Sequence, residues 1–200
     1  MLGAEEPVLK LRATVVGAAE APLTIQLLRW STDAERAPLL AALSAPPPPP
    51  AASAVAETAA PARGRGGRAG RGGRGAAPPS SPAARLTAAV KAAPTVGFIW
   101  GDGPTGYSIK YAWRSASPGA PSRVVLVTDR RLGAHSTSWP VTEVPATANE
   151  AEFTVVEMRI DAKGLGEAKA APASPVVDTA ANTLALDGYD AAPVLLRVTR

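Results

Sequence analysis

The run GFIWGDGPTGYSIKYAWRS, residues 97–115, is the stretch that decides the fold class. Its two β-rich segments, GFIWG and GYSIKYAWRS, lie on either side of a short turn rich in Gly, Asp and Pro. The connection is too short for a parallel return, because a crossover needs a dozen or more residues. The stretch therefore predicts an antiparallel hairpin.

The same β-rich pattern continues on both sides of this hairpin, with Gly, Pro, Asp and Asn as punctuation. The further runs are 8–16, 22–30, 123–130, 152–160, 182–187 and 193–200, with a short strand also expected at 165–169. After Ile160, Gly164 stands where a type I turn with a bulge needs a positive φ, which favours another hairpin. Eight or nine antiparallel strands predict a mainly β fold, either a barrel or a sandwich.

Two short helices are expected between the second and third strands. Thr32 and Glu35 have the T-x-x-E spacing of a capping box, and an apolar stripe at helical spacing follows, interrupted by Pro38. The second candidate, ARLTAAVKAAP, ends before Pro94. We expect these helices to close one end of the β structure or to cover one side.

Residues 45–82 consist almost entirely of Pro, Ala, Gly, Ser and Arg, a composition that buries too little apolar surface to offset the entropy of ordering. We interpret them as a disordered linker inserted into one β domain made of residues 1–44 and 83–200. Arginines recur in this linker between glycines, as in RNA-binding Arg-Gly segments. They are Arg63, Arg65, Arg68, Arg71 and Arg74.

The linker arginines allow three interpretations. They bind RNA specifically, they bind polyanions weakly, or the linker is inert. Specific RNA binding is disfavoured because no aromatic residue, which would stack on bases, occurs between Trp30 and Phe98. The formal net charge of +4 is also more than accounted for by these arginines, so the remainder of the chain is close to neutral.

Composition excludes several classes of chemistry. The chain of 200 residues has no cysteine and one histidine, which rules out thiol catalysis, disulfides and multi-histidine metal sites, and no cofactor is predicted. His135 lies in a polar loop without a nucleophile elbow. No run of 18 apolar residues occurs, and the N-terminal MLGAEEPVLK lacks the pattern of a signal peptide, although one could have been removed before this numbering begins.

Candidate binding residues come from the strand at 106–115. Strict alternation places Tyr107, Ile109, Tyr111 and Trp113 on one face, and Lys110 on the other. The aromatic stripe of Tyr107, Tyr111 and Trp113 either fills the core or lines a ligand pocket inside a barrel.

Charged residues within or at the end of two later strands are a further candidate. If these strands are neighbours, Glu157 and Arg159 could pair with Asp129 and Arg130 at a barrel mouth. A surface ion pair of small energetic effect is the alternative.

Five segments in this order resemble an uncharacterised family of exported bacterial proteins, typical of acidobacteria-like genomes. They are RWSTDAERAPLLAAL, VGFIWGDGPTGYSIKYAWR, RVVLVTDRRLGA, FTVVEMRIDAKGLGEAK and APVLLRVTR. The resemblance implies a secreted or periplasmic, mostly β protein and implies no catalytic residue. The chain departs from the family pattern at residues 45–82, where a short connection is expected.

Together these observations predict a non-enzymatic, secreted or periplasmic β-domain protein that binds a small apolar ligand or a protein partner. The alternatives are a hydrolase-like enzyme that uses scattered carboxylates or His135, and an RNA or polyanion binder that acts through the Arg-Gly linker.

Overall fold

The structure is a computed structural model that describes residues 6–17, 22–44, 81–101, 105–116, 119–132, 152–171, 175–190, 192 and 194–200. Most of the predicted linker lies outside these residues. Its last residue, Pro82, instead begins a helix whose first turn is capped by the Ser81 hydroxyl, which accepts a hydrogen bond from the Ala84 N–H.

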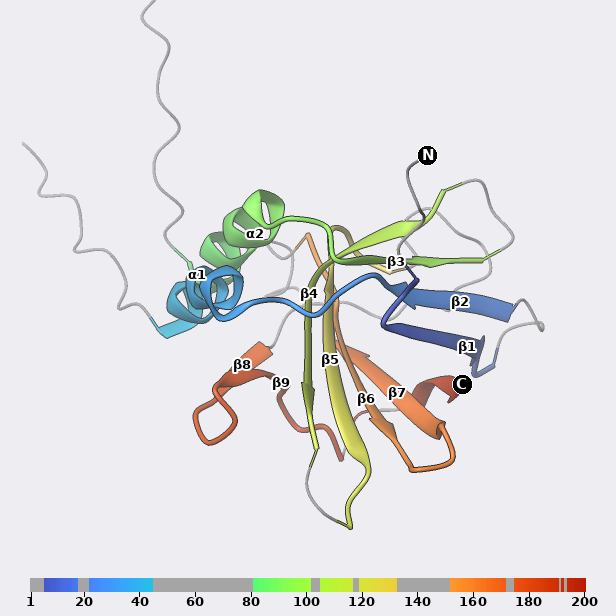
Figure 1. Ribbon diagram of the computed structural model, residues 1–200. Coiled ribbons are helices and arrows are strands. Elements are labelled where there is room, and N and C mark those ends of the chain that lie inside the picture. Colours follow the sequence, from blue (N-terminus) through green and yellow to red (C-terminus); the bar gives the residue numbers. More distant parts are fainter. Residues whose placement is uncertain are drawn as a thin grey trace, which may run out of the picture.

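Within the described residues, antiparallel strands close into an eight-stranded barrel (Figure 1). The strands are β1 (Leu9–Val15), β2 (Pro22–Leu27), β3 (Gly97–Trp100), β4 (Tyr107–Ser115), β5 (Ser122–Thr128), β6 (Val155–Ile160), β7 (Leu165–Ala171) and β10 (Val194–Thr199). They follow chain order around the barrel, and β1 pairs with β10 to close it, with Arg12 opposite Thr199 and Val15 opposite Leu196. The predicted mainly β fold is confirmed, and of the two predicted architectures it is the barrel.

Alternation along each strand divides the barrel wall into an inner and an outer face. On β1, Leu11 and Ala13 are buried in the interior, whereas Lys10 and Arg12 are exposed. The interior is apolar throughout, since β-branched and aliphatic side chains from all eight strands meet there. The turn after Ile160 has Gly164 at φ +83°, as predicted.

A second layer covers one side of the barrel. It consists of α1 (Asp33–Ser44), α2 (Pro82–Ala92) and a small antiparallel sheet of β8 (Pro175–Asp178) and β9 (Thr183–Leu186) (Figure 1). The helices and β9 bury a second apolar cluster against the outer face of β4, β5 and β6, to which Leu39, Leu86, Val90, Val125 and Leu184 contribute. The β8 strand was not predicted from the sequence.

The start of α1 has the predicted capping box. The Glu35 N–H donates to the Thr32 hydroxyl at 3.3 Å, and the Thr32 N–H donates to a Glu35 carboxylate oxygen at 2.9 Å. Arg29 adds a bidentate contact to the same carboxylate, with both distances at 2.7 Å. This contact lowers the pKa of Glu35 to about 2.

Candidate functional site

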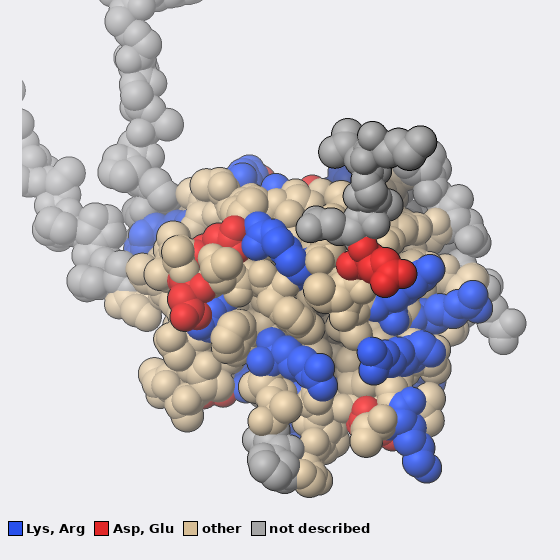
Figure 2. Space-filling view, viewed as in Figure 1, with Lys and Arg blue, Asp and Glu red and all other residues tan. Residues whose placement is uncertain are grey.

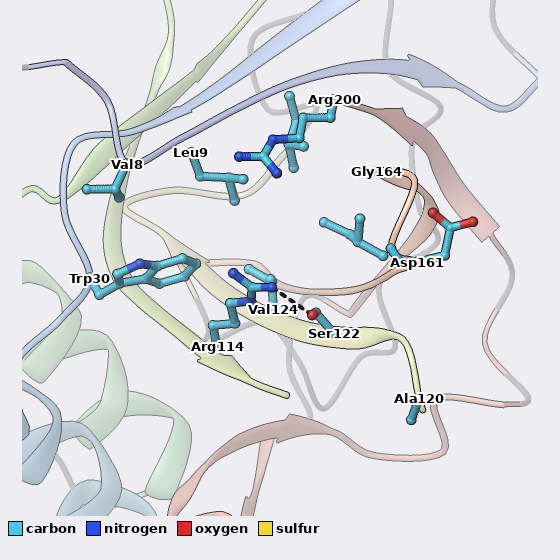
Figure 3. Close-up of a pocket in the computed structure, with 13 residues that line it drawn as sticks. Val8, Leu9, Trp30, Arg114, Ala120, Ser122, Val124, Asp161, Gly164 and Arg200 are labelled. Atoms are coloured by element: carbon cyan, nitrogen blue, oxygen red, sulfur yellow. Dashed lines mark hydrogen bonds between the residues drawn. The ribbon is translucent and has the colours of Figure 1, made fainter. Parts of the chain in front are cut away.

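A cavity of about 290 Å³ opens at the mouth of the barrel where β4, β6 and β10 end and β1, β5 and β7 begin. Its floor is apolar, and its rim is polar and aromatic (Figure 3). The floor includes Leu9, Leu11, Val124 and Ile160. The rim includes Trp30, Arg114, Ser122, Asp161 and Arg200.

The alternation of two strands brings both rim arginines to this mouth. Ala112 on β4 and Val198 on β10 belong to the barrel interior. Arg114 and Arg200 each follow two residues later, so they continue the inward face beyond the last layer of core side chains. Each guanidinium therefore lies over the apolar floor with access to water.

The rim carries an excess of positive charge. Arg114 Nη2 donates to the Ser122 hydroxyl at 2.9 Å, but neither Arg114 nor Arg200 forms an ion pair with a carboxylate of the described residues. Asp161 also lines the cavity, yet one of its carboxylate oxygens accepts the backbone N–H groups of Lys163 and Leu165, both at 2.9 Å, in its own turn. Figure 3 shows the two arginines near Trp30 and Leu9, with Asp161 on the other side of the cavity.

Trp30 forms an aromatic wall of the cavity, and the next residue fixes its position. The Ser31 N–H donates to the Ala112 carbonyl, and the Ala112 N–H donates to the Ser31 hydroxyl, both at 3.0 Å. This reciprocal pair ties the segment after β2 to the middle of β4. The half-buried Trp30 consequently packs on the interior cluster while part of its ring faces the cavity.

The cavity is confined to the mouth, because side chains fill the interior below it. Leu11, Ile25, Leu126 and Met158 each have 1% or less of their surface exposed and contact one another within the interior cluster. A ligand would therefore bind over the mouth and not inside the barrel.

The predicted stripe on β4 does not share one face, so that prediction is wrong. A β-bulge separates Ile109 from Tyr111: Ile109 pairs with Thr128, and Tyr111 pairs with its immediate neighbour Val127. One extra residue on β4 reverses the alternation that follows it. Tyr107 thus faces the barrel interior, whereas Tyr111 and Trp113 face the helical layer.

None of the three predicted pocket residues lines the mouth cavity. Tyr107 lies at the opposite end of the barrel, with the Arg130 guanidinium 5.4 Å from its ring centroid. The Tyr111 hydroxyl is buried against β9, and the Arg36 guanidinium lies 3.6 Å from the centroid of the Trp113 ring. The β-bulge, for which the sequence of β4 contains no signal, explains why Tyr111 and Trp113 face the helical layer while Tyr107 faces the interior.

β5 and β6 are neighbours, but the predicted pairing of Glu157 and Arg159 with Asp129 and Arg130 is not among the ion pairs of the described residues. Glu157 instead contacts Arg123, whose Nε lies 2.9 Å from a Glu157 carboxylate oxygen. Arg123 also contacts Asp178 at 2.6 Å, and Glu157 accepts the Leu186 N–H at 3.0 Å. Hydrogen bonding from Arg123 lowers the pKa of Asp178. These contacts fasten β8 and β9 to the barrel.

Tyr189 extends this buried polar cluster. The Arg159 guanidinium lies 3.8 Å from the centroid of its ring and the Lys169 ammonium 4.6 Å, and Lys169 donates to the Tyr189 carbonyl at 3.0 Å. Burial raises the pKa of Tyr189 to about 12, so its hydroxyl stays protonated at neutral pH. Because its charges are paired, we infer that the cluster holds the segment after β9 against the barrel.

Several predictions fall on residues outside the described ranges. These are His135 and the linker arginines Arg63, Arg65, Arg68, Arg71 and Arg74. Among the described residues, no group of three His, Cys, Asp or Glu side chains is placed to hold a metal ion. None of the described helices is both long and apolar enough to cross a bilayer.

Comparisons with known proteins give no relative for this chain. No family model matches it, and neither a curated protein nor a solved structure matches it. The functional argument therefore depends on the geometry of the barrel and its mouth.

Proposed function

We propose that this protein is a non-enzymatic binding protein that takes a small anionic ligand at the mouth of its barrel. The observation that carries the proposal is the pair of guanidinium groups, Arg114 and Arg200, over one apolar floor, without an ion pair to a described carboxylate. Such an arrangement suits a ligand with a carboxylate at one end, because guanidinium groups bind carboxylates through charge-assisted hydrogen bonds.

The rest of the cavity restricts the body of the ligand. Its floor of Leu9, Leu11, Val124 and Ile160 favours an apolar group, and the Trp30 ring offers a flat wall on which an aromatic or alicyclic ring can pack. The volume of about 290 Å³ is at the lower end of the range for small-molecule sites. The ligand class is accordingly a short carboxylic acid with a compact apolar body.

A calorimetric titration with matched probes tests this function. Benzoate and hexanoate should bind, whereas benzyl alcohol and hexylamine, which keep the apolar body without the negative charge, should bind at least tenfold more weakly. Equal affinity for the neutral alcohol and for the protonated, cationic amine would refute anion recognition. An absence of binding for all of the probes at millimolar concentration would refute a ligand site for such acids.

Variants locate the binding. Arg114→Gln and Arg200→Gln should each weaken benzoate binding about tenfold, the range for loss of one charge-assisted hydrogen bond. Arg197→Gln is the matched control, because Arg197 is on the same strand as the inward-facing Val198 but is exposed on the outer face. A similar loss with the control would mean that the barrel attracts anions only through its overall charge.

Export from the cell is a further part of this proposal, supported only by the resemblance of the sequence segments to exported bacterial proteins. Fractionation of cells that express the full-length gene would test it. Recovery of the protein solely from the cytoplasm would contradict export and would leave the ligand site unaffected.

A further inference from the structure

The outer face of β1, β2 and β3 carries cationic and aromatic side chains beside one another. We call this surface the basic-aromatic face, and define it by Lys10, Arg12, Thr24, Gln26, Phe98 and Trp100. Its members are side chains that point out of the barrel, away from the interior cluster. The helical layer packs on β4, β5 and β6, so it does not cover this part of the wall.

Strand register arranges these side chains in two rows. Lys10 pairs with Gln26, which pairs with Phe98, and Arg12 pairs with Thr24, which pairs with Trp100. Neighbouring strands are about 4.8 Å apart, so in each row the Cα atom of the basic residue lies about 10 Å from the Cα atom of the aromatic residue. The rows are about 7 Å apart along the strands. Each row therefore repeats one motif, a cation and a ring separated by a polar side chain.

The Phe98 ring is exposed and the Trp100 ring is half-buried. Phe98 is 37% exposed, and neither it nor Trp100 belongs to either of the apolar clusters of the structure. Their centroids are 5.9 Å apart and their planes are inclined by 53°, so they do not stack face to face. A hollow of about 370 Å³ lies beside Trp100, lined also by Arg12 and Thr24 among others.

The charge of this face is positive. Neither Lys10 nor Arg12 forms an ion pair with a carboxylate of the described residues. On the far side of Phe98, Asp129 accepts the Ser108 N–H at 3.0 Å and contacts Arg130 at 3.7 Å, so its charge is partly compensated. Figure 2 shows Lys and Arg side chains, with some acidic side chains beside them, on the side of the molecule where β1 and β2 lie in Figure 1.

A structural role accounts poorly for this combination. Phe98 and Trp100 belong to neither of the two buried clusters, and an accessible aromatic pair on a sheet has a cost in solubility. One exposed and one half-buried ring on a sheet, beside cations without an ion pair, instead provide what a single-stranded nucleic acid requires. Bases stack on the rings, and the backbone phosphates contact the cations.

We propose that the basic-aromatic face binds single-stranded nucleic acid, with one base on Trp100, a neighbouring base on Phe98 and phosphates at Arg12 and Lys10. The site lies on the outer wall and shares no lining residue with the mouth cavity. Stacking makes the binding tolerant of sequence, because every base has a π face. It is independent of the proposed anion site, so either proposal can fail alone.

Fluorescence anisotropy with a labelled dT oligomer and a labelled rU oligomer, each about 12 nucleotides long, tests the face in the full chain. Binding is expected for both probes and should weaken as the salt concentration rises. Trp100→Ala and Phe98→Ala should each reduce affinity about tenfold, the range for loss of one stacked base. Arg12→Gln should reduce the affinity and also make it less dependent on salt.

Three controls separate this face from other sources of binding. A chain in which Arg63, Arg65, Arg68, Arg71 and Arg74 are all changed to Gln should retain the binding that Trp100→Ala removes. Leu165→Ala, an exposed apolar residue elsewhere on the barrel, and Lys163→Gln, in the turn between β6 and β7, should have no effect. Loss of all binding in the five-arginine variant would overturn the proposal and would assign nucleic-acid binding to the Arg-Gly linker.

A comparison of ligands completes the test. Heparin and a duplex DNA of the same length present phosphate or sulfate charge without splayed bases. They should bind the variant in which the five linker arginines are changed to Gln at least tenfold more weakly than the dT oligomer does. Equal binding of these polyanions, or an unchanged dT affinity in the Trp100→Ala variant, would show that the face is only a cationic surface.

Discussion

Tyr111 on β4 and Thr183 on β9, 72 residues apart in the chain, share a hydrogen bond of 2.6 Å between their side-chain oxygens. Both side chains are buried, and the Tyr111 hydroxyl also accepts the Leu184 N–H at 3.3 Å. The ring of Tyr111 belongs to the apolar cluster beneath the helices. One side chain thus contributes packing to the helical layer and holds the β8–β9 sheet on the barrel.

Replacing Tyr111 with Phe should keep this packing and remove the hydrogen bonds. The buried Thr183 hydroxyl and Leu184 N–H would lose their partner, and the free energy of unfolding should fall by about 2 kcal/mol. Urea denaturation followed by circular dichroism would measure it. In a double-mutant cycle with Thr183→Val, a coupling energy near zero would contradict a direct bond between the two hydroxyls.

Glu157→Gln should destabilise the protein by about 2 kcal/mol, because a hydrogen bond to a buried charged group contributes more to stability than one between neutral groups. The Glu157 side chain is 2% exposed and is shared by Arg123 and the Leu186 N–H. Glu167→Gln is the matched control, since that side chain is 44% exposed on the next strand, and its effect should stay within about 0.5 kcal/mol. If the two variants lowered the thermal unfolding midpoint equally, the buried Glu157–Arg123 pair would contribute no more to stability than an exposed carboxylate.

The Arg29–Glu35 pair predicts a dependence of stability on pH. The folded pKa of Glu35 is lowered from 4.5 to about 2, so the pair stabilises the folded state at pH values above 4.5. This contribution is lost as the pH falls from 4.5 towards 2, where Glu35 becomes protonated in the folded state as well. At pH 7 the free energy of unfolding of the wild type should exceed that of the Glu35→Gln variant by about 0.5–1 kcal/mol. The difference should shrink below pH 4.5 in urea titrations, and an Arg29→Gln background should reduce it to the part that the Thr32 N–H hydrogen bond contributes.

Gly166 should not tolerate a side chain. A Cβ atom at this position would lie 2.2 Å from the Arg159 carbonyl oxygen, so the backbone of β6 or β7 would have to move. We expect Gly166→Ala to cost about 3 kcal/mol, at the upper end of overpacking effects. Gly119→Ala is the comparison, because its φ of +77° adds strain of about 1 kcal/mol while nothing lies within 4 Å of the new Cβ. The Gly166→Ala variant should have the lower midpoint in denaturant. A lower midpoint for Gly119→Ala would contradict the close approach of β6 and β7 at Gly166.

Much of the fold follows from local sequence patterns. The hairpin at 97–115, the capping box of Thr32 and Glu35, and the turn glycine at 164 are each specified within a few residues, and the structure has all three. β8 was missed because PVVD is only four residues long and contains a proline and an aspartate, which strands disfavour. Its conformation depends on the contact of Asp178 with Arg123, a residue far away in the chain.

The candidate site could not be predicted for the same reason. A β-bulge at Lys110 and Tyr111 depends on how β4 pairs with β5, and the sequence of β4 alone contains no signal for it. Arg114 and Arg200 line the same cavity because closure of the barrel brings the ends of β4 and β10 to one mouth. One signal was available for Arg200, which follows the inward-facing Val198 by two positions at the end of β10, whereas the inward orientation of Ala112 and Arg114 depends on the bulge.

The pairing that closes the barrel determines how the molecule would respond to a mechanical load. β1 and β10 are antiparallel, and Leu9 at the beginning of β1 and Thr199 at the end of β10 lie at the same mouth. A force that pulls these two residues apart acts across the ladder and reaches the Arg12–Thr199 pair first. The four residue pairs of the ladder would then separate one after another, as in a zipper, and would not have to break together. Tension applied across this seam is therefore resisted by one residue pair at a time.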